Sequence, residues 1–194
     1  MKKLFTTFAL IVLLHLTIII EKSEAQWEQT NGPHGGKVYC FAVSGTNLFA
    51  GIYGGVFLST NNGKNWTSVS NGLMELHVQA LAVSTGFSGT NIYAGTWNGV
   101  YLSTNNGSNW TIIGLTTQSV YTLAVSGSNL FAGTEGSGVF RSTNNGSNWT
   151  AVNNGITELH VHALAVSGTN LFAGTEGGVF LSTNEGANWT AVNY

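Results

Sequence analysis

The sequence predicts an all-β fold built from four tandem repeats, and two observations lead to that prediction. The first is an octet, Ser-Thr-Asn-x-Gly-x-Asn-Trp, which starts at residues 59, 103, 142 and 182. Successive octets are separated by 44, 39 and 40 residues. The second is a set of short apolar runs, divided by Gly, Asn and Ser turns, that accompanies each octet. Such a period indicates units that bury their apolar faces against one another.

Each repeat contains four runs with the β-branched and aromatic composition of strands. The first run ends in Ala-Val and covers residues 38–43, 78–83, 120–125 and 161–166. A second run, of the type Asn-Leu-Phe-Ala-Gly, follows a short turn and starts at residues 47, 91, 129 and 170. The third run is of the type Gly-Val-Phe-Leu, and the fourth begins at the octet tryptophan. The intervening turn residues favour hairpins, and the only proline, Pro33, precedes the first run.

Four antiparallel strands per repeat match the blade of a β-propeller. We therefore predict one domain over residues 26–194, with blades at about 33–72, 73–114, 115–155 and 156–194. Residues 27–32 align with a fourth strand and its turn, so an additional N-terminal strand is expected. Because the last blade already has a fourth strand, ring closure has three alternatives. They are a four-bladed ring with a spare strand, an open arc with exposed end faces, or a homodimer that completes a larger ring.

The octet resembles the Asp-box of BNR-repeat propellers, whose pattern is Ser-x-Asp-x-Gly-x-Thr-Trp. That family includes sialidases, xyloglucanases, the luminal propeller of sortilins and photosystem II assembly-factor-like proteins. The resemblance covers all four repeats and implies a propeller in which the box is a structural turn away from the active face. Asparagine replaces the family aspartate here. The residues assigned to this structural turn are Ser59, Asn61, Gly63, Trp66, Ser103, Asn105, Gly107, Trp110, Ser142, Asn144, Gly146, Trp149, Ser182, Asn184, Gly186 and Trp189.

Elementary chemistry agrees with a structural role for the octet. An asparagine oxygen at the third position can accept backbone N–H groups across the turn. The glycine allows a positive φ, and the tryptophan supplies a large apolar plate between blades. Since asparagine carries no charge, we do not expect the turn to bind calcium.

The N-terminus has the features of a secretory signal peptide. Lys2 and Lys3 precede an apolar stretch over residues 4–20, and Ser23 and Ala25 occupy the −3 and −1 positions of a cut before Gln26. Residues 1–25 are therefore predicted to be removed, leaving no membrane span. The alternative is an uncleaved anchor, because the stretch approaches the length that crosses a bilayer. The expected location is secreted, periplasmic or at the cell surface.

Composition and missing residue types limit the function classes. Only 7% of residues are charged, so no basic patch exists and nucleic acid is not an expected partner. The resemblance implies three arginines for a sialidase and paired aspartates for a xyloglucanase, but the chain has one arginine and no aspartate. Six glutamates remain after residue 25, which leaves a glutamate-based hydrolase as an alternative. We predict no catalytic residues and no cofactor.

A ligand face is predicted at the end of the blades opposite the octets, where equivalent positions differ between repeats. The middle hairpins present Tyr53, Trp97, Glu135 and Glu176, and the segments before two first strands present His77 and His160. Aromatic residues there suit a sugar ring or a peptide side chain, although they also fit ordinary turn residues. His160 and His162 alternate along a strand, which is compatible with metal ligation, but packing is the simpler interpretation.

Three function classes follow. The first is a secreted, non-catalytic module that binds a glycan or a protein through this face. The second is a purely structural propeller segment of a cell-surface assembly. The third is a glycoside hydrolase-like enzyme or its remnant.

Overall fold

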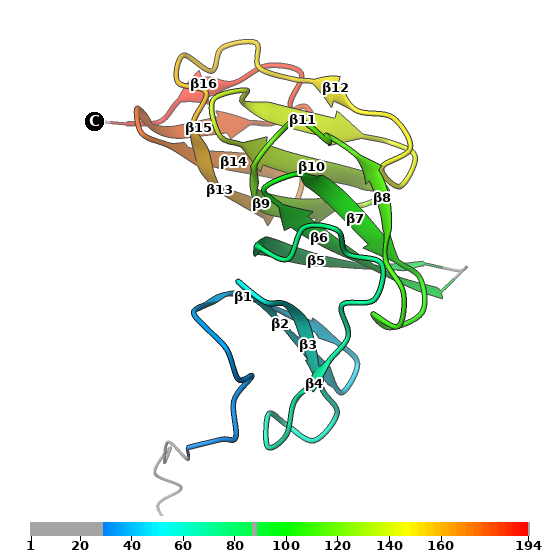
Figure 1. Cartoon of the computed structure of the whole chain (residues 1–194). Coiled ribbons are helices and arrows are strands. Elements are labelled where there is room, and N and C mark those ends of the chain that lie inside the picture. The colour runs from blue at the N-terminus through cyan, green and yellow to red at the C-terminus, as the bar shows by residue number, and fades with distance from the viewer. Residues whose placement is uncertain (1–28, 87–88, 194) are drawn as a thin grey trace, which may run out of the picture.

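Sixteen strands form four separate four-stranded antiparallel sheets in the computed structural model, which describes residues 29–86 and 89–193 (Figure 1). The described residues contain no helix, and hence none that could cross a bilayer. The predicted all-β fold with four four-stranded blades is thereby confirmed. The predicted signal peptide, residues 1–25, lies outside the described residues.

Each blade is a simple meander in which sequence neighbours pair. Blade 1 comprises β1 (Val38–Ser44), β2 (Asn47–Ile52), β3 (Gly55–Ser59) and β4 (Thr67–Ser68). Blade 2 comprises β5 (Val78–Gly86), β6 (Gly89–Thr96), β7 (Gly99–Ser103) and β8 (Thr111–Gly114). Blade 3 comprises β9 (Val120–Ser126), β10 (Asn129–Thr134), β11 (Val139–Ser142) and β12 (Thr150–Ala151). Blade 4 comprises β13 (Val161–Ser167), β14 (Asn170–Thr175), β15 (Gly178–Ser182) and β16 (Thr190–Ala191).

The first strand of every blade has a β-bulge at its second residue. In blade 4, Val161 pairs with Thr175 and Ala163 pairs with Gly174, so His162 is the extra residue. The same register shift occurs in the other blades at Tyr39, Gln79 and Tyr121. A bulge leaves its extra residue outside the ladder and redirects the side chain. Four equivalent side chains are therefore displaced from regular alternation at the same end of the four blades.

Neighbouring blades pack through a valine that sits on a glycine. A Cβ on Gly51, Gly95 or Gly133 would lie within 2.8 Å of a methyl group of Val78, Val120 or Val161, respectively. Each glycine belongs to the second strand of one blade, and each valine begins the first strand of the next blade. The absence of a Cβ lets the two sheets approach closely, and the buried apolar clusters lie at these contacts.

The array is open. β1 packs on β5, β5 on β9 and β9 on β13, whereas no comparable packing joins β13 to β1 among the described residues. Figure 1 shows blades 1 and 4 at opposite ends of the array. Of the three alternatives for closure, a single chain in this structure adopts the open arc.

The additional N-terminal strand expected at 27–32 does not appear in the described part of that segment. Residues 29–37 form no strand, and Trp27 and Glu28 lie outside the described residues. A strand needs a hydrogen-bonding neighbour, and each of the four sheets already has four members. Thr30 nevertheless lies near the first octet, since a Cβ on Gly63 would be 3.9 Å from its methyl group.

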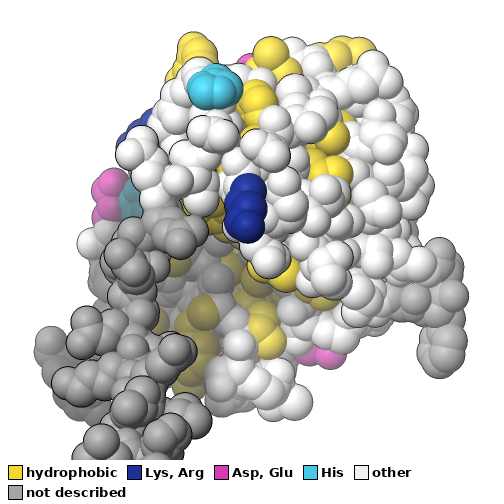
Figure 2. Space-filling view, turned by 90° about the horizontal axis from the view of Figure 1, so that it is seen from below, with side chains coloured by type: hydrophobic (Ala, Val, Ile, Leu, Met, Phe, Trp, Pro, Cys, Tyr) yellow, Lys and Arg dark blue, Asp and Glu magenta, His cyan; other side chains and the backbone are white. Residues whose placement is uncertain are grey.

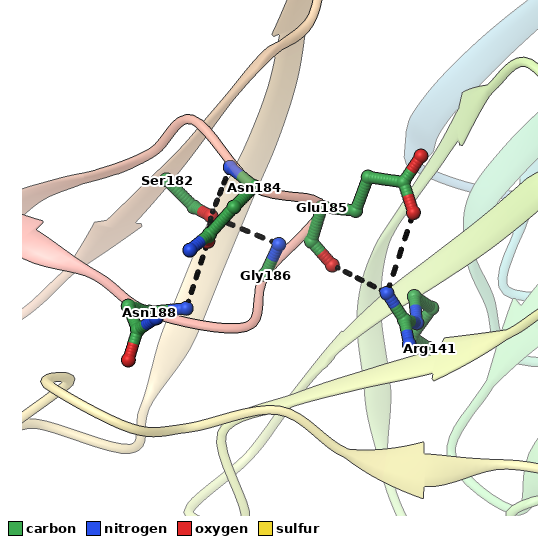
Figure 3. A network of polar contacts seen from close by, with 6 residues as sticks. All are labelled: Arg141, Ser182, Asn184, Glu185, Gly186 and Asn188. Carbon is green, nitrogen blue, oxygen red and sulfur yellow. Dashed lines mark hydrogen bonds and ion pairs between the residues drawn. The ribbon is translucent and has the colours of Figure 1, made fainter.

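Each octet is a turn held together by its serine and its third-position asparagine, as Figure 3 shows for blade 4. Ser182 Oγ donates to Asn184 Oδ1 at 3.0 Å and accepts from the Gly186 N–H at 2.9 Å. The Asn188 N–H donates to Asn184 Oδ1 at 2.9 Å. All four octets make these bonds, and the glycine has a positive φ in each. The serine is buried, and its hydroxyl is the acceptor that the structure gives the glycine N–H.

The octets also connect neighbouring blades. Trp110 Nε1–H donates to the Val69 carbonyl at 2.7 Å, and Trp189 Nε1–H donates to the Val152 carbonyl at the same distance. Arg141 of β11 donates to the Glu185 carbonyl at 3.1 Å, in the octet of blade 4 (Figure 3). These bonds fix the outer edge of one blade against the turn of the next, outside the apolar contact.

The contribution of the octet serine to stability can be tested at Ser103, whose Oγ accepts a hydrogen bond from the Gly107 N–H. Ser103→Ala leaves that buried N–H without its partner, so we expect the free energy of unfolding to fall by about 1–3 kcal/mol. Urea denaturation measures the change. Ser108→Ala, at an exposed position of the same octet, serves as the control and should change stability by less than about 0.5 kcal/mol. Equal effects of the two substitutions would contradict the assigned role of Ser103.

Candidate functional site

The four bulged side chains surround one hollow. Tyr39, Gln79, Tyr121 and His162, one from each blade, line a cavity of about 260 Å³. A second cavity of about 460 Å³ shares Gln79 and Tyr121 with the first and extends outward past Trp97 and Glu135. Asn98 and Ser119 complete its lining. The two cavities are therefore parts of one recess at the end of the blades away from the octets.

An aromatic cluster stands at the blade 1 and blade 2 side of this recess. The His77 ring lies between Trp97, with ring centroids 3.9 Å apart, and Tyr39 and Tyr53, each at 4.8 Å. Tyr53 and Trp97 are both exposed, so the parts of their rings that His77 does not cover are accessible to a ligand. Lys37 Nζ lies 5.1 Å from the centroid of the Tyr39 ring, which places one cation beside the cluster.

His77 is the most unusual member of the cluster. Its side chain is only 6% exposed, yet neither Nδ1 nor Nε2 has a hydrogen-bond partner among the described residues. Its backbone N–H does have one, because it donates to Glu75 Oε1 at 2.8 Å. Burial lowers the pKa of His77 below its ordinary value, so the ring is neutral at pH 7. A neutral imidazole offers one donor and one acceptor, and both are unused here.

A group of histidines and glutamates stands at the blade 3 and blade 4 side. His160 Nδ1 lies 2.9 Å from Glu158 Oε1, and this hydrogen bond raises the pKa of His160. His162 Nε2 lies 3.5 Å from Glu176 Oε1, and its ring stacks on Tyr121 at 5.8 Å between centroids. Burial, together with hydrogen bonding to Glu135, raises the pKa of Tyr121. This side of the recess therefore carries the carboxylates of Glu135, Glu158 and Glu176, whereas the aromatic side carries Glu75 together with the cation of Lys37.

The structure brings the predicted ligand-face residues together in these two groups. Tyr53, His77 and Trp97 form the first group, and Glu135, Glu176, His160 and His162 belong to the second. The alternation proposed for His160 and His162 is broken by the bulge at His162, and each histidine faces a different carboxylate. Among the described residues, no three His, Cys, Asp or Glu side chains are arranged to hold a metal ion.

The sequence analysis did not identify Tyr39, Gln79 and Tyr121 as site residues. They occupy apolar runs whose composition is that of ordinary core strands. A bulge has no sequence pattern that could be recognised within such a run. One signal did exist: the second residue of the first strand varies as Tyr, Gln, Tyr and His, while the preceding valine is the same in all four repeats. The first, fifth and sixth residues of the strand are the same in all four repeats, so polar and aromatic variation at the second indicated a position outside the apolar core.

The environment of His77 can be tested by replacing it with phenylalanine. Because its pKa is lowered, the unfolded chain binds more protons than the folded chain as pH falls below about 6.5. His77→Phe removes this difference in proton binding and also removes two unpaired polar atoms. The free energy of unfolding of the variant should therefore be higher by about 1 kcal/mol at neutral pH. Its advantage over the wild type should grow between about pH 7 and pH 5, as urea denaturation would show.

The control for this measurement is His34→Phe, which changes an exposed histidine in the loop before β1. It should leave the pH dependence of unfolding as in the wild type. An advantage of His77→Phe that stayed constant with pH would contradict the lowered pKa.

Neither a protein-family model nor a curated protein sequence matches the chain. Among solved structures it is similar to an ancestral GH74 enzyme, with 26% identity and a TM-score of 0.72 over 89% of this chain and 26% of that chain. It is also similar to the extracellular domain of a hybrid two-component system from B. thetaiotaomicron, with 20% identity, a TM-score of 0.72 and coverage of 87% and 24%.

A third similar structure is YCF48 bound to D1 peptide, with 15% identity, a TM-score of 0.61 and coverage of 87% of this chain and 58% of that chain. The chain spans about a quarter of the length of the first two structures. The chain therefore has a propeller-type blade architecture in common with these structures.

Proposed function

We propose that the protein is an extracellular, non-catalytic module that binds an uncharged glycan in the recess. The observation that carries this proposal is the convergence of four bulged side chains on one hollow. The same β-bulge recurs in each blade, yet the residue that it displaces differs. A repeated scaffold that presents different side chains to a common space is the arrangement expected of a binding surface.

The chemistry of the recess favours a sugar over a charged ligand. Trp97 and Tyr53 offer flat apolar rings with few rotatable bonds, which suit the apolar face of a pyranose. Gln79, Asn98 and Ser119 add amide and hydroxyl groups that can bond sugar hydroxyls in either direction. The described surface has few charged side chains, as Figure 2 illustrates for the blade 1 end. Long-range attraction of an ionic ligand would therefore be weak.

His77 would act by holding the two exposed aromatic rings in place, because its ring packs against both Trp97 and Tyr53. Both of its ring nitrogens are buried and it lines neither cavity, so it would not touch the ligand itself. Phenylalanine keeps a flat ring at this position. For this reason, we expect that His77→Phe raises stability and leaves binding close to that of the wild type.

The similar structures give separate support for an extracellular binding role. One of them is named as an extracellular domain and another is named as a complex with a peptide. The GH74 likeness, which covers about a quarter of that enzyme, instead favours the hydrolase alternative. Glu135 and Glu176 are the carboxylates that this alternative would use, since both lie near His160 at the edge of the recess. The structural-segment alternative requires no ligand.

The test is affinity electrophoresis of the mature protein against a panel of neutral and acidic polysaccharides. A neutral polysaccharide should retard the wild type, and Trp97→Ala should weaken its affinity at least tenfold, because the flat stacking area is lost while the fold is kept. Ile112→Ala, at an exposed apolar position of β8, is the matched control and should bind normally. Circular dichroism would verify that both variants fold.

Other outcomes separate the alternatives. Retardation only by a peptide would replace the glycan with a protein ligand. No retardation, or equal retardation of wild type and Trp97→Ala, would favour the structural segment. Reducing ends that appear with the wild type and disappear in Glu135→Gln or Glu176→Gln would favour the hydrolase.

A further inference from the structure

The contact between neighbouring blades has two halves, and each end of the array presents one of them. Blade 4 presents the half that would contact a following blade, which we call the tail face; its residues are Phe172, Gly174, Val179 and Val192. Blade 1 presents the half that would contact a preceding blade, which we call the head face; its residues are Val38, Phe41 and Val43. At the three internal contacts the equivalent residues meet each other inside the apolar clusters. Within a single chain the tail face and the head face do not meet.

The tail face lacks the cover that its counterparts have. Val179 is 41% exposed, whereas the equivalent Val56, Val100 and Val139 are fully buried. A Cβ on Gly174 would meet only Ala163 of its own blade, at 3.5 Å, whereas a Cβ on Gly133 would lie 2.6 Å from Val161 of the next blade. The place that a valine from a following blade would occupy is thus open at Gly174.

The head face is equally uncovered. Phe41 is 58% exposed, whereas the equivalent Leu81 and Leu123 are 8% and 9% exposed. Val43 is also exposed. Figure 2 views the molecule from this end and shows hydrophobic side chains among mostly uncharged polar ones. Such an apolar surface at the edge of a repeat array is a site for association.

The octets show the same complementarity in their hydrogen bonds. Trp66 Nε1–H is buried and has no acceptor among the described residues, whereas Trp110 and Trp189 use the carbonyls of Val69 and Val152. The residue of blade 4 equivalent to these valines is Val192, which is exposed. Trp149 also lacks an acceptor, but there a bulge at Ile113 displaces the corresponding carbonyl. The fourth strand of blade 4, which precedes Val192, has no such bulge.

The N-terminal segment covers little of the head face. Thr30 lies beside Gly63, where Val69 lies beside Gly107 and Val152 beside Gly186 in the internal contacts. A Cβ on Gly63 would be 3.9 Å from Thr30, against 3.0 Å from the valines at the other two glycines. Phe41 and Val43 remain exposed beside this segment. A larger partner is needed to cover them.

We propose that the partner is a second copy of this chain, docked head to tail. The tail face of one copy receives the head face of the other, so that Val38 sits on Gly174, Phe41 packs on Val179, and Trp66 bonds the carbonyl of Val192. Each of these pairs repeats a pair that already exists inside the chain. A head-to-tail contact uses two different surfaces, and two copies that each supply both surfaces close into one ring. The Val192 side of the partner would replace Thr30.

The test is the mass of the mature protein in solution, measured by light scattering over a range of protein concentrations. The wild type should have twice the chain mass. Val179→Glu should be a monomer, because it places an unpaired charge in the apolar contact, and Phe41→Lys should be a monomer for the same reason. Met74→Asp changes a fully exposed apolar side chain away from both faces and should leave the dimer intact.

Mixing the two monomeric variants provides the decisive step. A mixed dimer has one wild-type contact and one contact in which the glutamate introduced by Val179→Glu meets the lysine introduced by Phe41→Lys. Opposite charges would pair there, so the mixture should recover the dimer mass while each variant alone does not. A wild type that stays a monomer, a dimer that survives Val179→Glu, or a mixture that remains monomeric would each overturn the proposal.

Discussion

The whole array depends on one contact, the packing of a first-strand valine on the glycine of the preceding blade. Every four-stranded meander has two apolar faces and cannot bury them alone. A glycine in the second strand removes the side chain that would hold neighbouring sheets apart, and the valines of β5, β9 and β13 fill the space. Because the contact is made three times with the same residues, blade spacing is uniform, and the bulged side chains are brought to one axis.

The octets reinforce this contact with hydrogen bonds between blades at the outer edge of the array. Their serine and asparagine close the turn after the third strand, and the tryptophan that follows reaches the neighbouring blade. None of these interactions involves the recess, which lies at the opposite end of the blades. Because the octets and the recess lie at opposite ends of the blades, the octets can be nearly identical in four repeats while Tyr39, Gln79, Tyr121 and His162 differ. The repeated residues carry the stability of the array, and under the proposed function the residues that vary would carry recognition.

Much of the fold could be predicted from the sequence, because strand runs and turn residues are local signals. The fourfold repeat indicated the four blades. The divergent hairpin residues predicted a ligand face at one end, and the ligand there stays a prediction. The bulges could not be predicted, since a bulge depends on how two strands pair and not on one run alone. The stacking of Tyr53, His77 and Trp97 was missed for a similar reason: it arises between blades. The extra N-terminal strand was predicted because residues 27–32 align with the fourth strand of a repeat. Such an alignment does not show whether a sheet is present for the strand to pair with.

The most direct test of the blade contact compares two glycines that occupy the same position in different blades. Gly95 lies beneath Val120, and Gly174 lies at the open end, while the neighbour from the same blade is an alanine at both glycines. Gly95→Ala should therefore overpack the core while Gly174→Ala should not. With both changes made in the Phe41→Lys background to exclude assembly, urea denaturation should show a loss of about 1–3 kcal/mol for Gly95→Ala and little loss for Gly174→Ala. Equal losses, or none in either variant, would contradict the claim that the valine-on-glycine contact holds the array together.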